Sequence, residues 1–286
     1  MSTKKVTIQD IQQAKEDSRK LTMITAYDYP FGLLADEAGI DIVLVGDSLG
    51  MVVMGLEGTV AVNMEHMIHH IRAVTRGCKN PFIVGDMPFM SYNTSIREAI
   101  MNAGRLLKEG GCESIKLEGG VDFAQTIEAI VKAGIPVQGH IGLTPQTASA
   151  LGGFKMQGRD AAAAKRIIDD ARALEDAGVF SMILEAVPAP LGKLVAEAVK
   201  VPVIGIGAGP DVDGQVLVTH DMIGLFDKFV PRFVKQYTNI RKVILEALSE
   251  YKQEVLDVEF PAPEHSFKMQ KGALDQLKKL MEKEPF

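Results

Sequence analysis

Five short apolar segments of the chain end on a polar or charged side chain that could take part in chemistry. These end residues are Asp47, Asp86, Glu118, His140 and Glu185, and Lys116 comes two residues before Glu118. When parallel strands form one barrel, their carboxyl ends meet at a single mouth. Three carboxylates at that mouth repel one another strongly unless a cation lies between them. The pattern therefore predicts an active site that contains a cation.

A hard divalent ion is the predicted partner of Asp47, Asp86 and Glu118. The available ligands are oxygens, with no cysteine and no inward pair of histidines beside them, which favours Mg²⁺ over zinc. The alternative is a structural ion pair between one carboxylate and Lys116. We favour the metal site because one lysine cannot neutralise three carboxylates.

Mg²⁺ at such a mouth would chelate the carboxylate and carbonyl oxygens of a 2-oxo acid and acidify the adjacent C–H. Lys116 is predicted to neutralise the carboxylate of that substrate. Glu185 ends a strand on another side of the mouth, so we predict that it is the base that removes the proton, with a salt-bridged carboxylate as the alternative. His140 is predicted to orient the substrate or to donate a proton, unless it is a purely structural histidine.

The elements that must position these side chains are eight predicted strands that alternate with helices. The strands are expected at 21–26, 40–47, 82–86, 114–118, 137–140, 181–185, 201–209 and 215–219. On the second strand, Asp47 is expected to end the inward-facing row formed by Val43 and Val45. Eight such units predict an α/β fold, a single (β/α)₈ TIM barrel over residues 1–260. An open doubly wound sheet is the runner-up, but no Gly-x-Gly-x-x-Gly follows the first strand.

Three further segments have predicted roles. Thr7 and Asp10 have the spacing of a capping box, so an N-terminal helix is expected to cap the barrel floor. Residues 49–62 are expected to form a long loop, either a lid or an intersubunit contact. Residues 239–255 are expected to form the last barrel helix, and residues 261–286 a C-terminal tail helix that is not a separate domain.

Composition narrows the class of protein. The chain has 286 residues, 47% of them hydrophobic and 24% charged, which suits one large domain. Its formal net charge of -6 argues against nucleic acid or an anionic membrane as the main partner. We find neither an apolar signal core nor a run of about 18 uncharged apolar residues, so a cytoplasmic protein is predicted. Cys78 and Cys112 are expected to be free thiols.

Several motifs closely resemble those of the ketopantoate hydroxymethyltransferase family, in the same order over about residues 20–225. They are Gly46-Asp-Ser-Leu-Gly50, Val84-Gly-Asp-Met-Pro88, Lys116-Leu-Glu-Gly-Gly120, Gly139-His-Ile-Gly-Leu-Thr-Pro-Gln146, Glu185-Ala-Val-Pro188 and Ile204-Gly-Ile-Gly-Ala-Gly209. The resemblance implies a (β/α)₈ enzyme of pantothenate and coenzyme A biosynthesis. Such an enzyme moves a one-carbon unit from 5,10-methylenetetrahydrofolate to 3-methyl-2-oxobutanoate, giving 2-dehydropantoate and tetrahydrofolate.

Position by position, the resemblance also implies roles for individual residues. It assigns Asp47, Asp86 and Glu118 to Mg²⁺, assigns Asp47, Ser48, Asp86 and Lys116 to the oxo acid, and assigns proton abstraction to Glu185. Whether Glu118 reaches the ion directly or through water stays open. The resemblance also implies a homo-oligomer, specifically a homodecamer.

Two other classes of protein share part of this pattern. A related Mg²⁺-dependent lyase or mutase acting on another 2-oxo acid would share the metal carboxylates, but the cysteine-containing loop typical of the lyases is missing. A non-enzymatic barrel would not need carboxylates, a lysine and an opposed glutamate at one mouth. The glycine-rich segment 205–209 resembles a phosphate cradle in position, and we interpret it as room for close backbone approach or for the folate.

Overall fold

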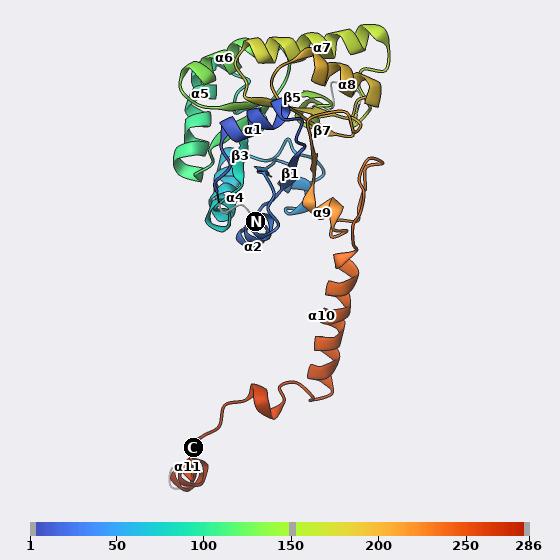
Figure 1. Ribbon diagram of the computed structural model, residues 1–286. Coiled ribbons are helices and arrows are strands. Elements are labelled where there is room, and N and C mark those ends of the chain that lie inside the picture. Colours follow the sequence, from blue (N-terminus) through green and yellow to red (C-terminus); the bar gives the residue numbers. More distant parts are fainter. Residues whose placement is uncertain (1–3, 149–152, 283–286) are drawn as a thin grey trace. The chain divides into compact units, whose positions relative to one another are not determined.

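The computed structural model describes residues 4–148 and 153–282 (Figure 1). The first three residues, the middle of the loop after the fifth strand and the end of the predicted tail helix lie outside the described residues. Eight parallel strands close into a barrel in the order β1 to β8, each strand pairing with the next and β8 with β1. The predicted (β/α)₈ barrel is therefore confirmed. The strands are β1 Leu21–Thr25, β2 Ile42–Val45, β3 Phe82–Asp86, β4 Ser114–Glu118, β5 Val137–Gly142, β6 Ser181–Glu185, β7 Val203–Ile206 and β8 Gly214–Leu217.

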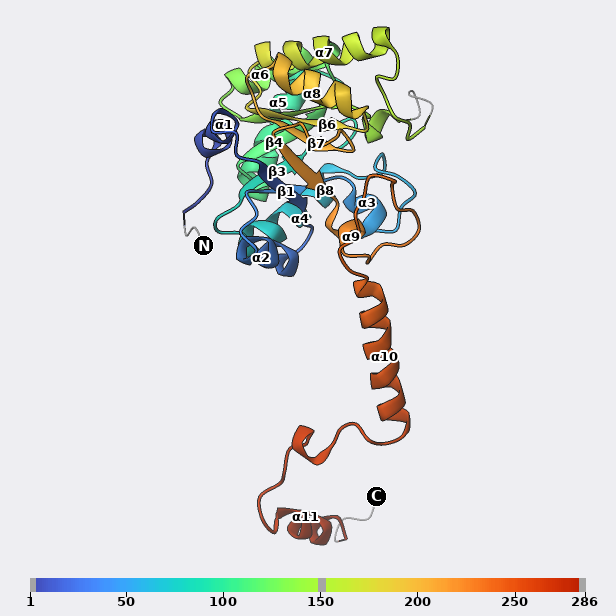
Figure 2. The ribbon, with the colours of Figure 1, turned by 45° about the vertical axis from the view of Figure 1, so that its right-hand side comes forward.

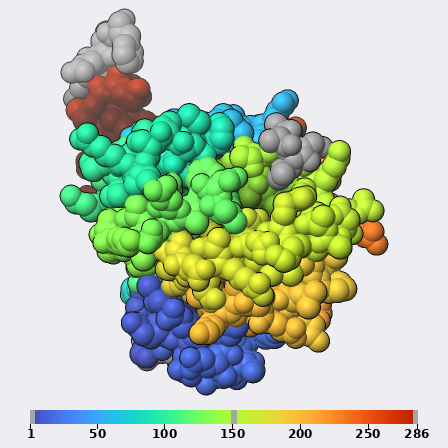
Figure 3. All heavy atoms as spheres, turned by 90° about the horizontal axis from the view of Figure 1, so that it is seen from above, coloured from blue at the N-terminus to red at the C-terminus, as the bar shows by residue number. Residues whose placement is uncertain are grey.

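Helices connect and flank these strands. The α-helices are α1 Ile8–Glu16, α2 Tyr29–Glu37, α3 Leu49–Val52, α4 Met64–Gly77, α5 Ile96–Arg105, α6 Ala124–Lys132, α7 Ala161–Asp176, α8 Ala189–Ala198, α9 Thr219–Met222, α10 Ile240–Leu256 and α11 Ala273–Met281. Short helical turns of other types are η1 Leu106–Gly110, η2 Val121–Phe123, η3 Pro145–Thr147 and η4 Pro263–His265. Neighbouring helices α5, α6, α7 and α8 pack side by side, and in Figure 3 their side chains cover one face of the molecule.

Alternate residues of the strands fill the barrel interior. Ile42 and Leu44 of β2 pack in the same apolar cluster as Phe82 and Val84 of β3, whereas Val43 and Val45 pack with the surrounding helices. Side chains of α1 join the interior cluster, and α1 begins with the predicted capping box. In Figure 2, α1 lies at one end of the barrel, and α3 and α9 lie at the other. The predicted capping helix is thus confirmed.

The prediction that Asp47 ends an inward-facing row with Val43 and Val45 was wrong. Val43 and Val45 turn toward the helices rather than inward, and β2 ends at Val45. Gly46 and a turn follow, so the strand alternation no longer governs Asp47, which reaches the barrel mouth from the turn. The next residues also differ from expectation, because α3 forms the first four residues of what was predicted to be one loop.

The described chain divides into two compact units, Met1–Tyr237 and Thr238–Phe286. The division falls before α10, which was assigned to the barrel, rather than at residue 260. The position after β8 is taken by the four-residue helix α9. None of the described residues from 238 to 282 is fully buried, so the second unit has no core of its own. Among the described residues, no helix is long and apolar enough to span a membrane.

Close packing of α2 against α4 depends on two glycines. A Cβ at Gly77 would lie 2.5 Å from the carbonyl oxygen of Tyr29 and 2.7 Å from the amide nitrogen of Leu33. A Cβ at Gly32 would lie 2.8 Å from the carbonyl oxygen of Val74. These neighbours are backbone atoms, so they cannot move aside without shifting a helix.

We predict that Gly77→Ala lowers the free energy of unfolding by about 1–3 kcal/mol, because the added methyl group overpacks the contact between α2 and α4. Gly104→Ala is the matched control, because Gly104 lies inside α5 and a Cβ there would meet no atom within 4 Å. That variant should gain about 0.5–1 kcal/mol from helix propensity. Urea denaturation measures both, and equal stabilities of the two variants would contradict this packing.

Candidate active site

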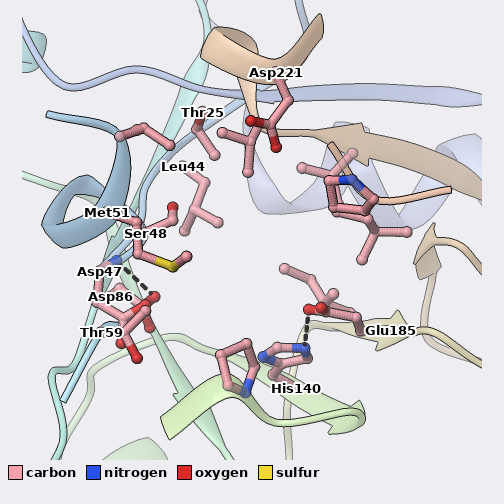
Figure 4. Close-up of a pocket in the computed structure, with 18 of the residues that line it drawn as sticks. Thr25, Leu44, Asp47, Ser48, Met51, Thr59, Asp86, His140, Glu185 and Asp221 are labelled. Carbon is pink, nitrogen blue, oxygen red and sulfur yellow. Dashed lines mark hydrogen bonds and ion pairs between the residues drawn. The ribbon is translucent and has the colours of Figure 1, made fainter. Parts of the chain in front are cut away.

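One cavity at the carboxyl ends of the strands brings together every side chain that the sequence assigned to the site (Figure 4). Asp86 ends β3, Lys116 and Glu118 lie on β4, His140 lies on β5 and Glu185 ends β6. Asp47 and Ser48 come from the turn after β2. The cavity-facing positions continue the alternation of the buried interior residues, as in Phe82, Val84 and Asp86.

Lys116 is the central cation of this cluster and is only 3% exposed. Its Nζ lies 2.8 Å from Oδ1 of Asp86 and 3.6 Å from Oε1 of Glu118. Burial alone would lower the pKa of the ammonium group, but the attraction of Asp86, Glu118 and Asp47 raises it above its usual value. Lys116 therefore stays charged in the barrel interior.

The carboxylates are not fully compensated by this lysine. Burial, together with repulsion from Asp86 and Glu118, raises the pKa of Asp47 well above its usual value. Burial also raises the pKa of Asp86, despite its contact with Lys116. Burial raises the pKa of Glu118 as well, but the charges and hydrogen bonds of Lys116 and His140 outweigh it and hold that pKa below the usual value. Ionisation of Asp47 and Asp86 together is therefore unfavourable unless a further cation comes close to them.

His140 connects this cluster to Glu185. Its Nδ1 lies 3.3 Å from Oε1 of Glu118. Its Nε2 lies 3.2 Å from Oε2 of Glu185, and a dashed line marks this contact in Figure 4. Burial and the charge of Lys116 lower the pKa of the imidazole, but its contacts with the two glutamates outweigh them and raise it to about 9. His140 Nδ1 also lies 3.3 Å from Nζ of Lys116. The imidazole is therefore placed between the lysine and two carboxylates and is not an isolated structural histidine.

The backbone around Glu185 is closely held. Its carbonyl oxygen accepts a hydrogen bond of 2.9 Å from the amide of Leu143, and the next residue, Ala186, has a φ of 49°. The amide of Ala186 donates to the carbonyl oxygen of Ile206 at 2.8 Å. A non-glycine residue in this left-handed region is uncommon and persists only where its surroundings require it. These bonds fix the direction in which Glu185 leaves its strand.

Sequence reasoning missed three residues that touch the cluster. Gln146 donates from Nε2 to Oδ2 of Asp47 at 2.9 Å and from its amide to Oε2 of Glu118 at 3.0 Å. The hydroxyl of Tyr92 donates to Oε1 of Gln146 at 2.7 Å, and the hydroxyl of Tyr27 lies 2.8 Å from Oγ of Ser48. Gln146 ends one of the quoted motifs, so its position in that motif was the available signal.

The donor set fits a hard divalent cation. In the described parts of the chain, no three Asp, Glu, His or Cys side chains are already grouped as a metal site. Nε2 of Gln146 donates to Oδ2 of Asp47, whereas Oδ1 of Asp86 lies 2.8 Å from Nζ of Lys116 but has no hydrogen-bond partner among the described residues. The two aspartates supply oxygen ligands, and a cation would relieve the repulsion between them. They can therefore bind Mg²⁺ if Gln146 and Lys116 leave some of these oxygens free for the ion.

Another side of the cavity is apolar and aromatic. Phe226, Phe229 and Phe233 line it, together with the acidic side chain of Asp221. The glycine-rich segment after β7 packs beneath this wall. A Cβ at Gly207, whose φ is 64°, would lie 2.7 Å from the ring of Phe233. The sequence predicted that some group would approach the backbone closely at this segment, and in the structure that group is the ring of Phe233.

Solved structures with a similar fold share little sequence with this chain. Phosphonopyruvate hydrolase in complex with oxalate and Mg²⁺ superimposes with a TM-score of 0.62 at 14% identity, covering 97% of this chain and 98% of the other. The 2,3-dimethylmalate lyase, described as a PEP mutase/isocitrate lyase superfamily member, has a TM-score of 0.58 at 13% identity, covering 96% and 95%. These likenesses concern the barrel fold alone.

Sequence comparisons are far closer. The 3-methyl-2-oxobutanoate hydroxymethyltransferase of Moorella thermoacetica is 56% identical over 264 residues, covering 92% of this chain and 98% of that protein. The protein of the same name from Carboxydothermus hydrogenoformans is 51% identical over 273 residues, covering 96% and 99%. The sequence model of ketopantoate hydroxymethyltransferase matches residues 5–263. With its predicted motifs gathered around one barrel mouth, the chain belongs to the ketopantoate hydroxymethyltransferase family.

Proposed function

We propose that this enzyme transfers a hydroxymethyl group from 5,10-methylenetetrahydrofolate to 3-methyl-2-oxobutanoate, giving 2-dehydropantoate and tetrahydrofolate, with Mg²⁺ as its metal. The observation that carries the proposal is that one cavity holds three crowded carboxylates with a lysine and, apart from them, a further carboxylate, Glu185. The names of the relatives support the identity of the acceptor. The folate donor is implied by the motifs that resemble the family, and the metal is proposed from the crowded carboxylates at the barrel mouth.

Asp47 and Asp86, with Glu118 directly or through water, would hold Mg²⁺. When bound, Mg²⁺ supplies Lewis-acid polarisation of the 2-oxo group and so makes the neighbouring C–H more acidic. Phosphonopyruvate hydrolase, which has a similar barrel, forms a complex with oxalate and Mg²⁺. That complex supports the proposal that a barrel of this kind can bind a divalent ion together with a small dicarboxylate.

Lys116 and Ser48 would bind the oxo acid. The buried ammonium of Lys116 can face the substrate carboxylate while it keeps its contact with Asp86. The hydroxyl of Ser48 is oriented by Tyr27 and lines the same cavity. Together with Asp47 and Asp86, these residues place one end of the substrate against the cluster.

Glu185 would remove the proton from C3, and His140 would orient Glu185. The C–H electron pair then forms the enolate. Water would add to the one-carbon unit of the folate, whose two bonds to nitrogen break while both nitrogens take up the protons of water, so that tetrahydrofolate and formaldehyde are formed. C3 of the enolate would then attack the formaldehyde carbon, and the new alkoxide would take the proton that Glu185 carries. The contact of His140 Nε2 with Glu185 at 3.2 Å holds the carboxylate in place. His140 also touches Glu118, so the base and the substrate-binding cluster are fixed relative to each other.

A homo-oligomer, specifically a homodecamer, and a cytoplasmic location remain predictions. The exposed apolar side chains of α10 support an oligomer, because Leu245, Leu248 and Leu256 are each more than half exposed. Light scattering coupled to size-exclusion chromatography measures the subunit number.

The direct test of the proposed activity is an assay with 3-methyl-2-oxobutanoate and 5,10-methylenetetrahydrofolate, with and without Mg²⁺, in which 2-dehydropantoate is detected by mass spectrometry. The proposal expects product that depends on both substrates and falls when the metal is chelated. Absence of product under all conditions would reject it.

We predict that Asp47→Asn and Asp86→Asn each weaken Mg²⁺ binding by about tenfold or more, because each loses a charged oxygen ligand. The fold should remain intact, since removing one carboxylate relieves repulsion in the cluster. Titration calorimetry with Mg²⁺ measures the affinity. Asp211→Asn is the control, because Asp211 is exposed and does not line the cavity. Affinities equal to that of the control would refute the metal assignment.

Lys116→Ala should raise KM for the oxo acid by about tenfold or more and lower kcat, because the substrate carboxylate loses its buried cationic partner. Steady-state kinetics at saturating Mg²⁺ measure both constants. If both stayed at their wild-type values, Lys116 would act only as a structural ion pair.

Glu185→Gln should slow the exchange of the C3 proton of 3-methyl-2-oxobutanoate with deuterium by about 100-fold or more, because the base is lost. The substitution keeps the size of the side chain, so Mg²⁺ and the oxo acid should still bind. Proton NMR in D₂O follows the exchange without folate. Exchange at the wild-type rate would show that another group takes the proton, with His140 the first to be examined.

A further inference from the structure

Asp221 is a buried carboxylate in the cavity for which the proposed reaction so far has no use. It lies in α9, directly after β8, and is only 7% exposed. In Figure 4 it points into the cavity from a different side than Asp47 and Asp86. Its Oδ1 has no hydrogen-bond partner among the described residues. A buried acceptor of this kind is costly to keep unless a ligand satisfies it.

The fold holds this carboxylate firmly in position. The amide of Thr219 donates to Oγ1 of Thr25 at 3.0 Å, and the hydroxyl of Thr219 donates to the carbonyl oxygen of Thr25. The ring of His220 packs against the rings of Tyr27 and Phe31, with 5.2 Å between ring centroids in each case. Contacts of Thr219 and His220 therefore hold α9 in place, and they fix the position of the Asp221 carboxylate. Burial raises the pKa of its carboxyl group to about 6, and in the described part of the chain no cation offsets this effect.

The surroundings of Asp221 indicate a flat ligand with N–H donors. Phe226, Phe229 and Phe233 line the same cavity and offer aromatic surfaces to a planar ring. The two oxygens of a carboxylate can accept two parallel hydrogen bonds from neighbouring N–H groups. The reduced pteridine of a folate has such an edge, with its 2-amino group next to N3–H.

Barrel topology separates this acceptor from the oxo acid site. β8 lies four strands from β4 in either direction around the closed barrel, and β4 carries Lys116 and Glu118. Glu185 ends β6, midway between them. A ring held at Asp221 would therefore approach the oxo acid from the other side of the mouth, as a transfer between two bound substrates requires.

We propose that Asp221 is the recognition group for the pteridine ring of the folate, its carboxylate accepting hydrogen bonds from the 2-amino group and N3–H. This assignment rests on the proposed function and adds to it the residue that selects the second substrate. Asp221 takes no part in proton removal from the oxo acid, which is the task of Glu185.

The first test is Asp221→Asn, which keeps the size of the side chain. It replaces one acceptor oxygen by an NH₂ group, which cannot accept a hydrogen bond from the N–H groups of the ring. We expect KM for 5,10-methylenetetrahydrofolate and the Kd for tetrahydrofolate to rise by about 10- to 100-fold. The folate-independent exchange of the C3 proton should stay at the wild-type rate. Asp211→Asn, an exposed aspartate outside the cavity, is the matched control.

The second test uses the wild-type enzyme and a 2-desamino-2-methyl analogue of tetrahydrofolate, and so does not depend on the variant folding. The wild type should bind this analogue about 10- to 100-fold more weakly than tetrahydrofolate, and Asp221→Asn should discriminate much less between the two. Equal binding of both ligands by the wild type would overturn the assignment. A KM of Asp221→Asn equal to that of Asp211→Asn would also overturn it, as would loss of C3 exchange in Asp221→Asn. If wild-type enzyme formed no product, the proposed function itself would fail, and the assignment with it.

Discussion

Burial of like charges is the constraint on which the rest of this site depends. Asp47, Asp86 and Glu118 are each less than a tenth exposed, and their mutual repulsion is opposed within the described cluster by Lys116, which lies 2.8 Å from Asp86 and 3.6 Å from Glu118. Carboxylates are rarely buried without compensation, because leaving water costs several kcal/mol per ion. Natural proteins accept such costs at functional sites, where a ligand can relieve them. The proposed Mg²⁺ would relieve the repulsion that remains between Asp47 and Asp86.

A closed barrel is well suited to hold these charges together. Alternate residues of each strand build an apolar interior, and the last inward position of β3, β4 and β6 carries the reactive group. Contacts across neighbouring strands then fix the groups, as His140 on β5 does between Glu118 on β4 and Glu185 on β6. The same geometry leaves the β8 side of the mouth apolar and aromatic, apart from Asp221, so two substrates of different chemistry can be placed facing each other.

Much of this arrangement could be predicted from the sequence because strand alternation is local. The bounds of β3, β4 and β6 and the inward facing of Lys116 and Glu118 follow from apolar runs that stop at a charged residue. If the alternation continued past Gly46, it would put Asp47 on the outward face of Val43 and Val45. Asp47 reaches the mouth because the chain turns after Gly46. The contacts of Gln146 and Tyr92 were beyond reach, since they depend on how loops far apart in the sequence meet. The apolar stripe of α10 indicated packing but could not show that this helix belongs to the second unit.

The most direct test of the central claim is a calorimetric titration of the wild-type enzyme with Mg²⁺ in the presence and in the absence of saturating 3-methyl-2-oxobutanoate. If Asp47, Asp86 and Glu118 hold the ion and the ion in turn holds the oxo acid, each ligand must strengthen the binding of the other. The account predicts that Mg²⁺ binds about tenfold or more tightly when the oxo acid is present. An Mg²⁺ affinity that is the same with and without the oxo acid would contradict a shared site at Asp47 and Asp86.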